Sequence, residues 1–424
     1  MPSTGSTAPR GPHYANYVLA VLVAVNLFNF VDRQIVAVLL QQIKEDFVVS
    51  DASLGLLTGL AFVLVHSLIG VPIARLADRG SRRTVIAVGV AVWSALTALS
   101  GAAQSFVQLA ALRVGVGIGE AAGTPPSHSL VSDYFPPARR ARALSILAIG
   151  LYAGIMFGYL VAGWLGQTLG WRATMTAVGL PGLALAALVW GTIDEPRRGA
   201  DEAVPAVREV IAYLLTRRAY LALLVAASFH ACAGYAMAHW SPTFLVRVHG
   251  FSYAQVGVAL GLLTGGVGAA GAIAGGRLSD RLALRDRRWY PWTAAIAAWA
   301  GIPFAALFLT IGSAPLALAC FAPHIFFSGL YTGPLYAMNQ GLAKPRMRAT
   351  AVALHLLVVS IIGGGLAPWW VGHLSDAFAA EQGAEALRPA LLIVACASGA
   401  LAGVFYLVAS VWVRDDLSSA EAIS

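Results

Sequence analysis

Charged residues are scarce in this sequence. Only 11% of its 424 residues are Asp, Glu, Lys or Arg, whereas 58% are hydrophobic and the mean hydropathy is +0.73. A soluble domain carries about 25% charged residues. The composition therefore argues against an ordinary soluble protein and indicates a chain that crosses a membrane several times.

Cysteine is also scarce, and Cys232, Cys320 and Cys396 lie far apart in apolar runs. This spacing fits neither a zinc site nor a disulfide framework, so we expect these side chains to pack in the interior. The sequence also lacks a phosphate-binding glycine loop, a metal-ligand cluster and a nucleophile triad. We therefore expect neither an enzyme, nor an ATP-driven pump, nor a protein with a bound metal or cofactor.

Apolar runs long enough to cross a bilayer recur along the chain. A transmembrane helix needs about 20 apolar residues, and charge clusters separate runs of this length. The first run exceeds a signal-peptide core, so we expect no cleaved signal. We predict twelve spans, at about residues 17–40, 52–74, 84–103, 106–133, 143–168, 172–193, 219–246, 253–276, 289–311, 315–341, 348–375 and 388–412.

Lys and Arg residues gather on one side of the predicted membrane. With both termini in the cytoplasm, 22 of the 28 lie on the cytoplasmic side, four lie on the other side, and Arg33 and Arg113 lie within spans. This distribution satisfies the positive-inside rule. We predict a multi-pass protein of the cell (inner) membrane with both termini cytoplasmic. The net charge of +8 then reflects topology and does not indicate a nucleic-acid partner.

A polar stretch divides the chain into two halves of six spans. Gly55 recurs as Gly257, and Asp78 recurs as Asp280, each 202 positions later. Parallel six-span repeats are the architecture of the major facilitator superfamily, so we predict an all-α membrane protein of this fold with two pseudo-symmetric six-helix bundles. Its predicted parts are a cytoplasmic tail at 1–16, a bundle at 17–193, a cytoplasmic linker at 194–218, a bundle at 219–412 and a cytoplasmic tail at 413–424.

Four charged residues interrupt the apolar runs: Asp32 and Arg33 in the first predicted span, and Arg113 and Glu120 in the fourth. A charge at the bilayer centre costs about 2.5–3.5 kcal/mol, so these side chains must face protein or water. Arg113 and Glu120 share one helix face, whereas Asp32 and Arg33 point to different sides. We predict that the two acids exchange protons and that the arginines hold an anionic substrate group. A purely structural pair is the alternative.

Two basic loops carry a repeated motif. Residues 74–83 and 276–281 resemble the superfamily's Gly-x-x-x-Asp-Arg-x-Gly-Arg-Arg pattern, with Ala74 and Ser81 in place of its glycines. The Asp of this motif can accept from backbone N–H groups at a helix N-terminus and hold the cytoplasmic side closed. Surface ion pairs are the alternative. We predict a cytoplasmic gate at Asp78, Arg79, Arg142, Asp280 and Arg281.

A central cavity would need polar and aromatic side chains from both halves. Aromatic rings suit an acyl chain, and hydroxyl or amide groups suit a headgroup, although ordinary packing explains any one of them as well. We predict that this cavity is lined by Asn29, Tyr152, Tyr235, Trp240 and Tyr331.

Residues 25–198 resemble the spinster family of lipid transporters. The resemblance implies a rocker-switch transporter of sphingosine-1-phosphate or lysophospholipids that is discussed as proton-coupled. Asp32, Arg33, Arg113 and Glu120 match the buried charged positions of that family. The segments that carry the resemblance are 29–33, 113–121, 132–146, 158–163 and 195–197.

We therefore expect a monomeric secondary active transporter that lies in the lipid bilayer, uses a proton gradient and needs no cofactor. It moves an amphipathic lipid, such as a lysophospholipid or a sphingosine-1-phosphate-like molecule, by alternating access. One alternative is a proton-coupled carrier of a small organic anion or drug. Another is a non-transporting membrane sensor on the same scaffold.

Overall fold

The computed structural model describes residues 11–196 and 206–421, and within these ranges every regular element is a helix. The first half holds seven helices. Two of its spans are interrupted, at Gly59 and at residues 121–123. The helices are α1 (Pro12–Phe47), α2 (Asp51–Thr58), α3 (Leu60–Arg79), α4 (Arg82–Ser100), α5 (Phe106–Glu120), α6 (Thr124–Tyr134) and α7 (Pro137–Thr192).

The second half follows a short helix, α8 (Val207–Leu215), and also contains interrupted spans. Two interruptions are π-helical, at Leu263–Val267 and Ser360–Leu366, and two segments are 3₁₀-helical, at Pro345–Met347 and Gly383–Ala386. The α-helices are α9 (Arg218–His249), α10 (Tyr253–Leu262), α11 (Gly268–Ala283), α12 (Trp289–Thr310), α13 (Ala314–Leu330), α14 (Thr332–Gly341), α15 (Arg348–Val359), α16 (Ala367–Gln382) and α17 (Leu387–Glu421).

Ten segments of the described chain are long and apolar enough to cross a membrane. Two of them, Arg142–Thr192 and Thr350–Ser419, are long enough for two crossings. The first turns back at Gly170, whose φ of 77° favours glycine, and the second turns at Gly383–Ala386. The chain thus makes twelve crossings, and the predicted all-α fold of two six-helix bundles is confirmed.

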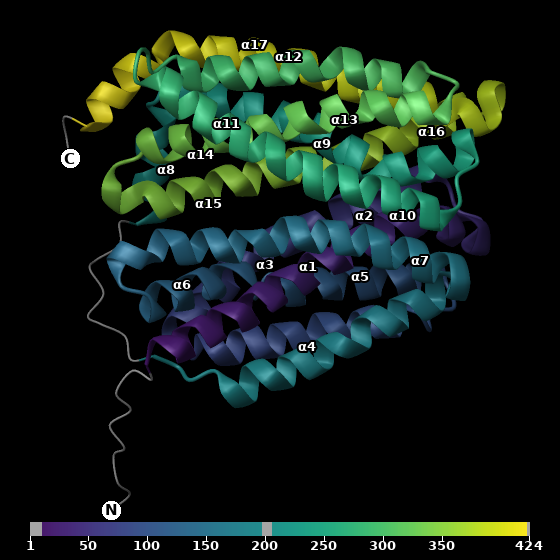
Figure 1. Ribbon diagram of the computed structural model, residues 1–424, viewed down its shortest axis with the longest axis horizontal. Coiled ribbons are helices and arrows are strands. Elements are labelled where there is room, and N and C mark those ends of the chain that lie inside the picture. The colour runs from purple at the N-terminus through teal and green to yellow at the C-terminus, as the bar shows by residue number, and fades with distance from the viewer. Residues whose placement is uncertain (1–10, 197–205, 422–424) are drawn as a thin grey trace, which may run out of the picture.

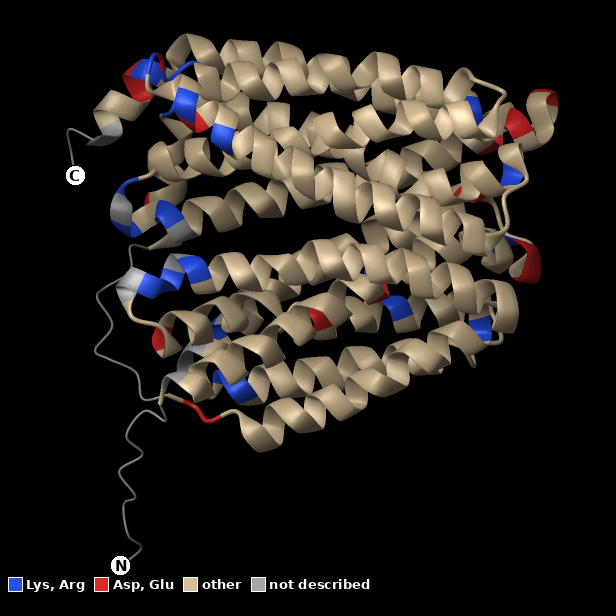
Figure 2. Cartoon of the chain, viewed as in Figure 1, with Lys and Arg blue, Asp and Glu red and all other residues tan. Residues whose placement is uncertain are grey.

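The two halves form two layers in Figure 1, with α1–α7 in one and α9–α17 in the other. The first turn of α1 and the last turn of α17 lie at the same end of the molecule, here called the terminal end. The opposite end, where α1 stops at Phe47 and α9 stops at His249, is called the far end. Figure 2 shows that charged residues gather at these two ends, with only a few in the middle of the first half.

Two helices extend beyond the predicted spans at the terminal end. α1 begins at Pro12, and α17 runs to Glu421, so the predicted tail at 413–424 is helical for most of its length. An ion pair and a hydrogen bond stabilise the extension of α17: Arg414 pairs with Asp286, and Asp416 accepts from the backbone N–H of Ala219 at 2.8 Å. The hydrogen bond from Arg414 lowers the pKa of the Asp286 carboxyl.

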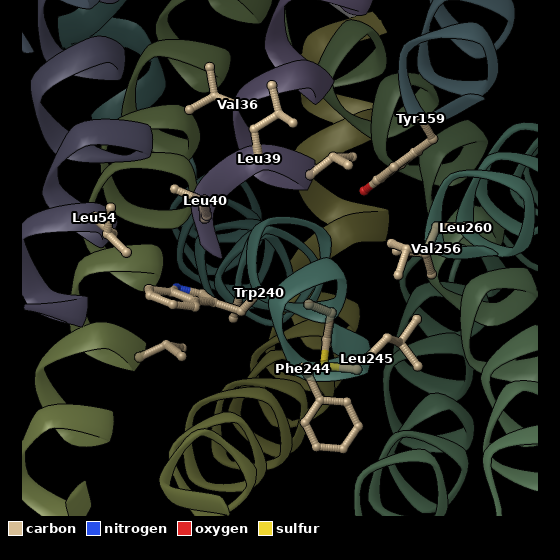
Figure 3. Packing of buried hydrophobic residues seen from close by; sticks show 14 of the residues in the cluster. Val36, Leu39, Leu40, Leu54, Tyr159, Trp240, Phe244, Leu245, Val256 and Leu260 are labelled. Carbon is tan, nitrogen blue, oxygen red and sulfur yellow. The ribbon is translucent and has the colours of Figure 1, made fainter. Parts of the chain in front are cut away.

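A buried hydrophobic cluster joins the halves toward the far end (Figure 3). Leu39 and Leu40 of α1 and Tyr159 of α7 come from the first half, and Trp240 and Phe244 of α9 come from the second. The Tyr159 hydroxyl donates to the Ala238 carbonyl at 3.0 Å. The halves therefore share a packed core there.

Glycines bring the backbones of the two halves close together. A Cβ on Gly163 would lie 2.5 Å from the Tyr253 carbonyl oxygen, and one on Gly257 would lie 2.5 Å from that of Tyr159. Only residues without a side chain permit such an approach of α7 to α10.

Candidate functional site

Asp32 and Arg113 form a fully buried ion pair inside the first half. The Arg113 Nη1 atom lies 2.9 Å from Asp32 Oδ2, and the Thr97 hydroxyl donates to Oδ1 at 2.5 Å. Both charged side chains are at most 5% exposed. Both carboxylate oxygens of Asp32 are thus bonded, one by α5 and the other by α4.

Arg33 turns to a different partner. Its Nε donates to Glu120 Oε2 at 2.7 Å, and its Nη2 lies 3.3 Å from Nε2 of His66 on α3. The Glu120 side chain is fully buried, whereas 26% of the Arg33 side chain is exposed. The predicted divergence of Asp32 and Arg33 appears in this geometry: Asp32 faces α4 and α5, and Arg33 reaches the end of α5 and α3.

Helix packing places Glu120 at an interruption of its span. α5 ends at Glu120, and α6 begins at Thr124 with two prolines in its first turn. A Cβ on Gly119 would lie 2.7 Å from the Trp93 backbone nitrogen, so glycine lets α4 approach this point closely. The acid is therefore held against α4 where its own helix stops.

Aromatic rings flank both arginines. The Arg33 guanidinium carbon lies 5.3 Å from the Phe30 ring centroid and 5.4 Å from that of Phe62. Phe62 also lies 5.7 Å from the guanidinium of Arg113. Cation–π contacts of this kind contribute about 0.5–2 kcal/mol without fixing the direction of a hydrogen bond. They therefore stabilise the positive charge in more than one orientation of the guanidinium.

Two buried polar side chains in this region retain unused hydrogen-bonding atoms. Glu120 Oε1 and both amide atoms of Asn29 have no hydrogen-bond partner within the described structure. Asn29 lines a small cleft between α1, α6 and α7, with Ser127 and His128 on its wall. Unpaired buried groups are costly, so these atoms are the places where a proton, water or substrate would be stabilising.

The second half approaches Arg33 through α9. Arg33 interacts electrostatically with His239, and the His239 ring stacks with Tyr235 at 5.9 Å. Tyr235 is 37% exposed. Arg33 is thus the member of the charged set that lies within electrostatic range of His239 in the other half.

The remaining predicted cavity residues have different surroundings. Tyr152 is partly buried, and its backbone faces Gly265 of the other half. Tyr331 stacks on His230 with ring centroids 3.7 Å apart. Trp240 is fully buried and donates to the Pro368 carbonyl at 2.9 Å. This placement gives Trp240 a packing role in the present conformation.

The predicted gate residues lie at the terminal end. Asp280 accepts from the Tyr290 hydroxyl of its own half at 3.3 Å, and Arg142 and Arg281 are exposed. The backbone of Asp78 and Arg79 ends α3, but their side chains lie outside the described part of the structure. The gating role of these residues stays a prediction.

The last residues of the first loop motif bind partners that also belong to the first half. Arg82 donates to Asp133 of α6 at 2.5 Å and to Glu195, after α7, at 2.8 Å. Ser81 also donates to Glu195 at 3.0 Å. Sequence analysis did not identify this cluster, which ties together α4, α6 and the chain after α7.

An ion cluster at the far end was not predicted either. Asp51, which opens α2, accepts from Lys44 at 2.6 Å and from both terminal nitrogens of Arg247 at 2.6 and 2.7 Å. Ser375 of α16 donates to the same carboxylate at 2.8 Å. Arg247 and Ser375 belong to the second half, so this carboxylate joins the halves.

A second carboxylate, which belongs to the second half, accepts hydrogen bonds from the first half at the same place. Asp376 of α16 accepts from the backbone N–H groups of Asp51 and Ala52 at 2.9 and 2.8 Å. It therefore caps the N-terminus of α2 from the other half. The sequence signal was weak: Lys44 and Arg247 are two of only four basic residues assigned to that side.

Comparisons with known proteins agree with this architecture. The model of the Major Facilitator Superfamily matches residues 22–368. An MFS-type efflux pump of Mycolicibacterium smegmatis is 35% identical, with 96% of this chain and 95% of that protein covered. Protein spinster homolog 3 of Danio rerio is 27% identical, over 100% of this chain and 90% of that protein.

A solved structure extends the comparison. The crystal structure of a bacterial homologue of the human lysosomal transporter spinster, in an inward-facing and unoccupied conformation, matches with a TM-score of 0.87. It is 30% identical, and the match covers 96% of this chain and 99% of that one. Proteins of this kind are transporters and not enzymes. The chain belongs to the major facilitator superfamily and, within it, to the spinster family of transporters.

Proposed function

We propose that this protein is a proton-coupled transporter of an amphipathic molecule with an anionic headgroup, such as a lysophospholipid or a sphingosine-1-phosphate-like lipid. The observation that carries the proposal is the Arg33–Glu120 pair. Arg33 is partly exposed and lies within electrostatic range of His239 in the second half, whereas Glu120 is fully buried and keeps one oxygen unpaired. A proton on Glu120 and an anion on Arg33 would each break this ion pair, so the binding of one would favour the binding of the other.

Protonation of Glu120 is the step that links proton binding to substrate binding. A neutral Glu120 no longer holds Arg33 as an ion pair, and the planar guanidinium can turn to a phosphate or carboxylate with two parallel hydrogen bonds. Loss of the proton restores the pair and releases the headgroup. Asp32 remains a second candidate for proton exchange, but Thr97 and Arg113 already occupy its oxygens.

Alternating access would expose the site to one side of the membrane and then to the other. The contacts that join Asp51 to the second half lie at the far end, and the spinster homologue of similar structure is inward-facing. We propose that the terminal end is cytoplasmic, in an inner membrane, because the Lys and Arg residues of the loops gather there. One chain provides both halves of the site, so we propose a monomer that draws on a proton gradient alone.

A second candidate is the export of a small organic anion or drug. The M. smegmatis relative, described as an MFS-type efflux pump, favours it. The same arginine would then hold a smaller anion without an acyl chain.

A flux assay in proteoliposomes separates these candidates. Labelled lysophospholipid and labelled small organic anions are each offered with and without an imposed pH gradient. The proposal expects lysophospholipid flux that the gradient accelerates. Flux of small anions without lipid movement would favour the second candidate, and lipid flux indifferent to the gradient would contradict proton coupling.

A further inference from the structure

His66 is a half-buried residue of α3 that touches both Arg33 and α5. Its Nε2 lies 3.3 Å from Arg33 Nη2, and its Nδ1 lies 3.2 Å from the Gly117 carbonyl oxygen. The ring also stacks on Phe62, one helical turn earlier, with 5.7 Å between centroids and 12° between planes. The imidazole is therefore fixed on three sides.

These contacts determine which ring nitrogen carries the hydrogen. A carbonyl oxygen can only accept, so Nδ1 must donate to Gly117. Arginine can only donate, so Nε2 must accept from Arg33. His66 consequently acts here as a neutral acceptor, and its tautomer is set by the Gly117 carbonyl.

The local packing makes this arrangement specific. A Cβ on Gly117 would lie 3.1 Å from the Phe62 carbonyl oxygen and 3.3 Å from its ring, so the glycine allows α3 to lie against α5. The Phe62 ring then lies beside the Arg33 guanidinium, and the His66 ring that stacks on it contacts the same group. Two of the three guanidinium nitrogens are directed in this way, one to Glu120 and one to His66.

We infer that His66 is a positioning residue that fixes the Arg33 guanidinium in the orientation from which it binds Glu120 and, after protonation of Glu120, the anionic headgroup. The inference rests on the proposed function for its second part only. Its first part concerns the contact between Arg33 and Glu120, which exists without substrate.

Two substitutions separate the hydrogen bond of His66 from its packing. His66→Phe keeps an aromatic ring against Phe62 but has no acceptor for Arg33. His66→Gln supplies an acceptor and an amide donor without a ring. His13→Phe changes an exposed histidine of the same half, outside the cleft beside Asn29, and is the matched control.

The direct readout is the infrared band of the Glu120 carboxyl group in the purified full-length protein, isolated by subtracting the spectrum of Glu120→Gln. We expect the band to shift in His66→Phe, to return toward its original position in His66→Gln and to stay unchanged in His13→Phe. An unshifted band in His66→Phe would overturn the inference. So would equal shifts in the two phenylalanine variants.

Binding of oleoyl-lysophosphatidylglycerol to the same proteins is the second readout. Loss of a hydrogen bond to a charged group corresponds to about a tenfold change in affinity, so we expect His66→Phe to bind about tenfold more weakly. In an Arg33→Lys background, His66→Phe should add little, because His66 acts through Arg33. Additive losses would contradict positioning. Absence of binding by the unmodified protein would contradict the proposed lipid substrate, while the infrared band would still decide the role of His66.

Discussion

Arg33 Nε and Glu120 Oε2 lie 2.7 Å apart, although the neighbouring residue Asp32 pairs with Arg113 in the opposite direction. Adjacent residues of one helix thus serve two ion pairs. The Asp32 pair is buried among α1, α4 and α5, whereas Arg33 is partly exposed and lies within electrostatic range of His239 in the second half. In the proposed function, the Arg33 pair is therefore better placed to change partners than the Asp32 pair.

Removal of one member of the Asp32 pair should destabilise the first half. Asp32→Asn would leave Arg113 charged and without its counter-ion, which costs about 3–5 kcal/mol at a buried site. Thermal unfolding in detergent should show a clear fall in the midpoint. The double variant Asp32→Asn/Arg113→Gln should recover much of the loss, because it removes the uncompensated charge. Equal stability of the single variant and the unmodified protein would argue against a buried ion pair.

Replacement of Arg33 by lysine should weaken anion binding while keeping the positive charge. The guanidinium reaches Glu120 and His66 at once, whereas an ammonium group is a point charge without the planar fork. We expect about a tenfold loss of affinity for an anionic lysophospholipid, as measured by equilibrium binding. Unchanged affinity would show that Arg33 does not hold the headgroup.

The Asp51 cluster should set the balance between the two access states. Asp51→Asn removes the charge that binds Lys44 and Arg247, so the far end should open more often. Spin labels on cysteines introduced at Val48 and Glu381, in a cysteine-free background, should then show a larger population at long distances.

A matched control exists at the same end of the molecule. Asp46 pairs with Arg172 at 2.9 Å, and both residues belong to the first half. Asp46→Asn should therefore leave the distance distribution as it is. Identical distributions for both variants and the unmodified protein would rule out Asp51 as a lock between the halves.

Transport should also require close backbone contact between the halves at the far end. A Cβ on Gly372 would lie 2.2 Å from the Asp51 carbonyl oxygen, so Gly372→Val should prevent closure of that end and abolish transport. Gly191, which has no heavy atom within 4 Å of an added Cβ, provides the control Gly191→Ala. Transport assays on protein that elutes normally in gel filtration should separate the two. Full transport by Gly372→Val would contradict obligatory closure.

The central charges could be predicted from the sequence because charged residues are rare inside the apolar runs. A charge inside an apolar run is expensive, so Asp32, Arg33, Arg113 and Glu120 were identified as a set without any distance information. Helical spacing also predicted that Asp32 and Arg33 diverge. It could not assign their partners, because that depends on how α3, α4 and α5 pack around α1.

The Asp51 cluster at the far end could not be predicted from the sequence for a related reason. Asp51 and Ser375 lie 324 residues apart and look like ordinary residues of their segments. Lys44 and Arg247 are unremarkable as loop charges until the fold brings them to one carboxylate. Trp240 shows the converse: an aromatic residue on a cavity-lining span packs into the buried interface, and periodicity does not distinguish the two environments.

Substrate-driven proton movement tests the central claim most directly. Proteoliposomes that contain a pH-sensitive dye are given a lysophospholipid gradient, and the internal pH and the lipid flux are followed together. The account predicts proton movement with the unmodified protein. With Glu120→Gln, it predicts no proton movement, while exchange of labelled for unlabelled lipid continues. Undiminished substrate-driven proton movement in Glu120→Gln would contradict the account.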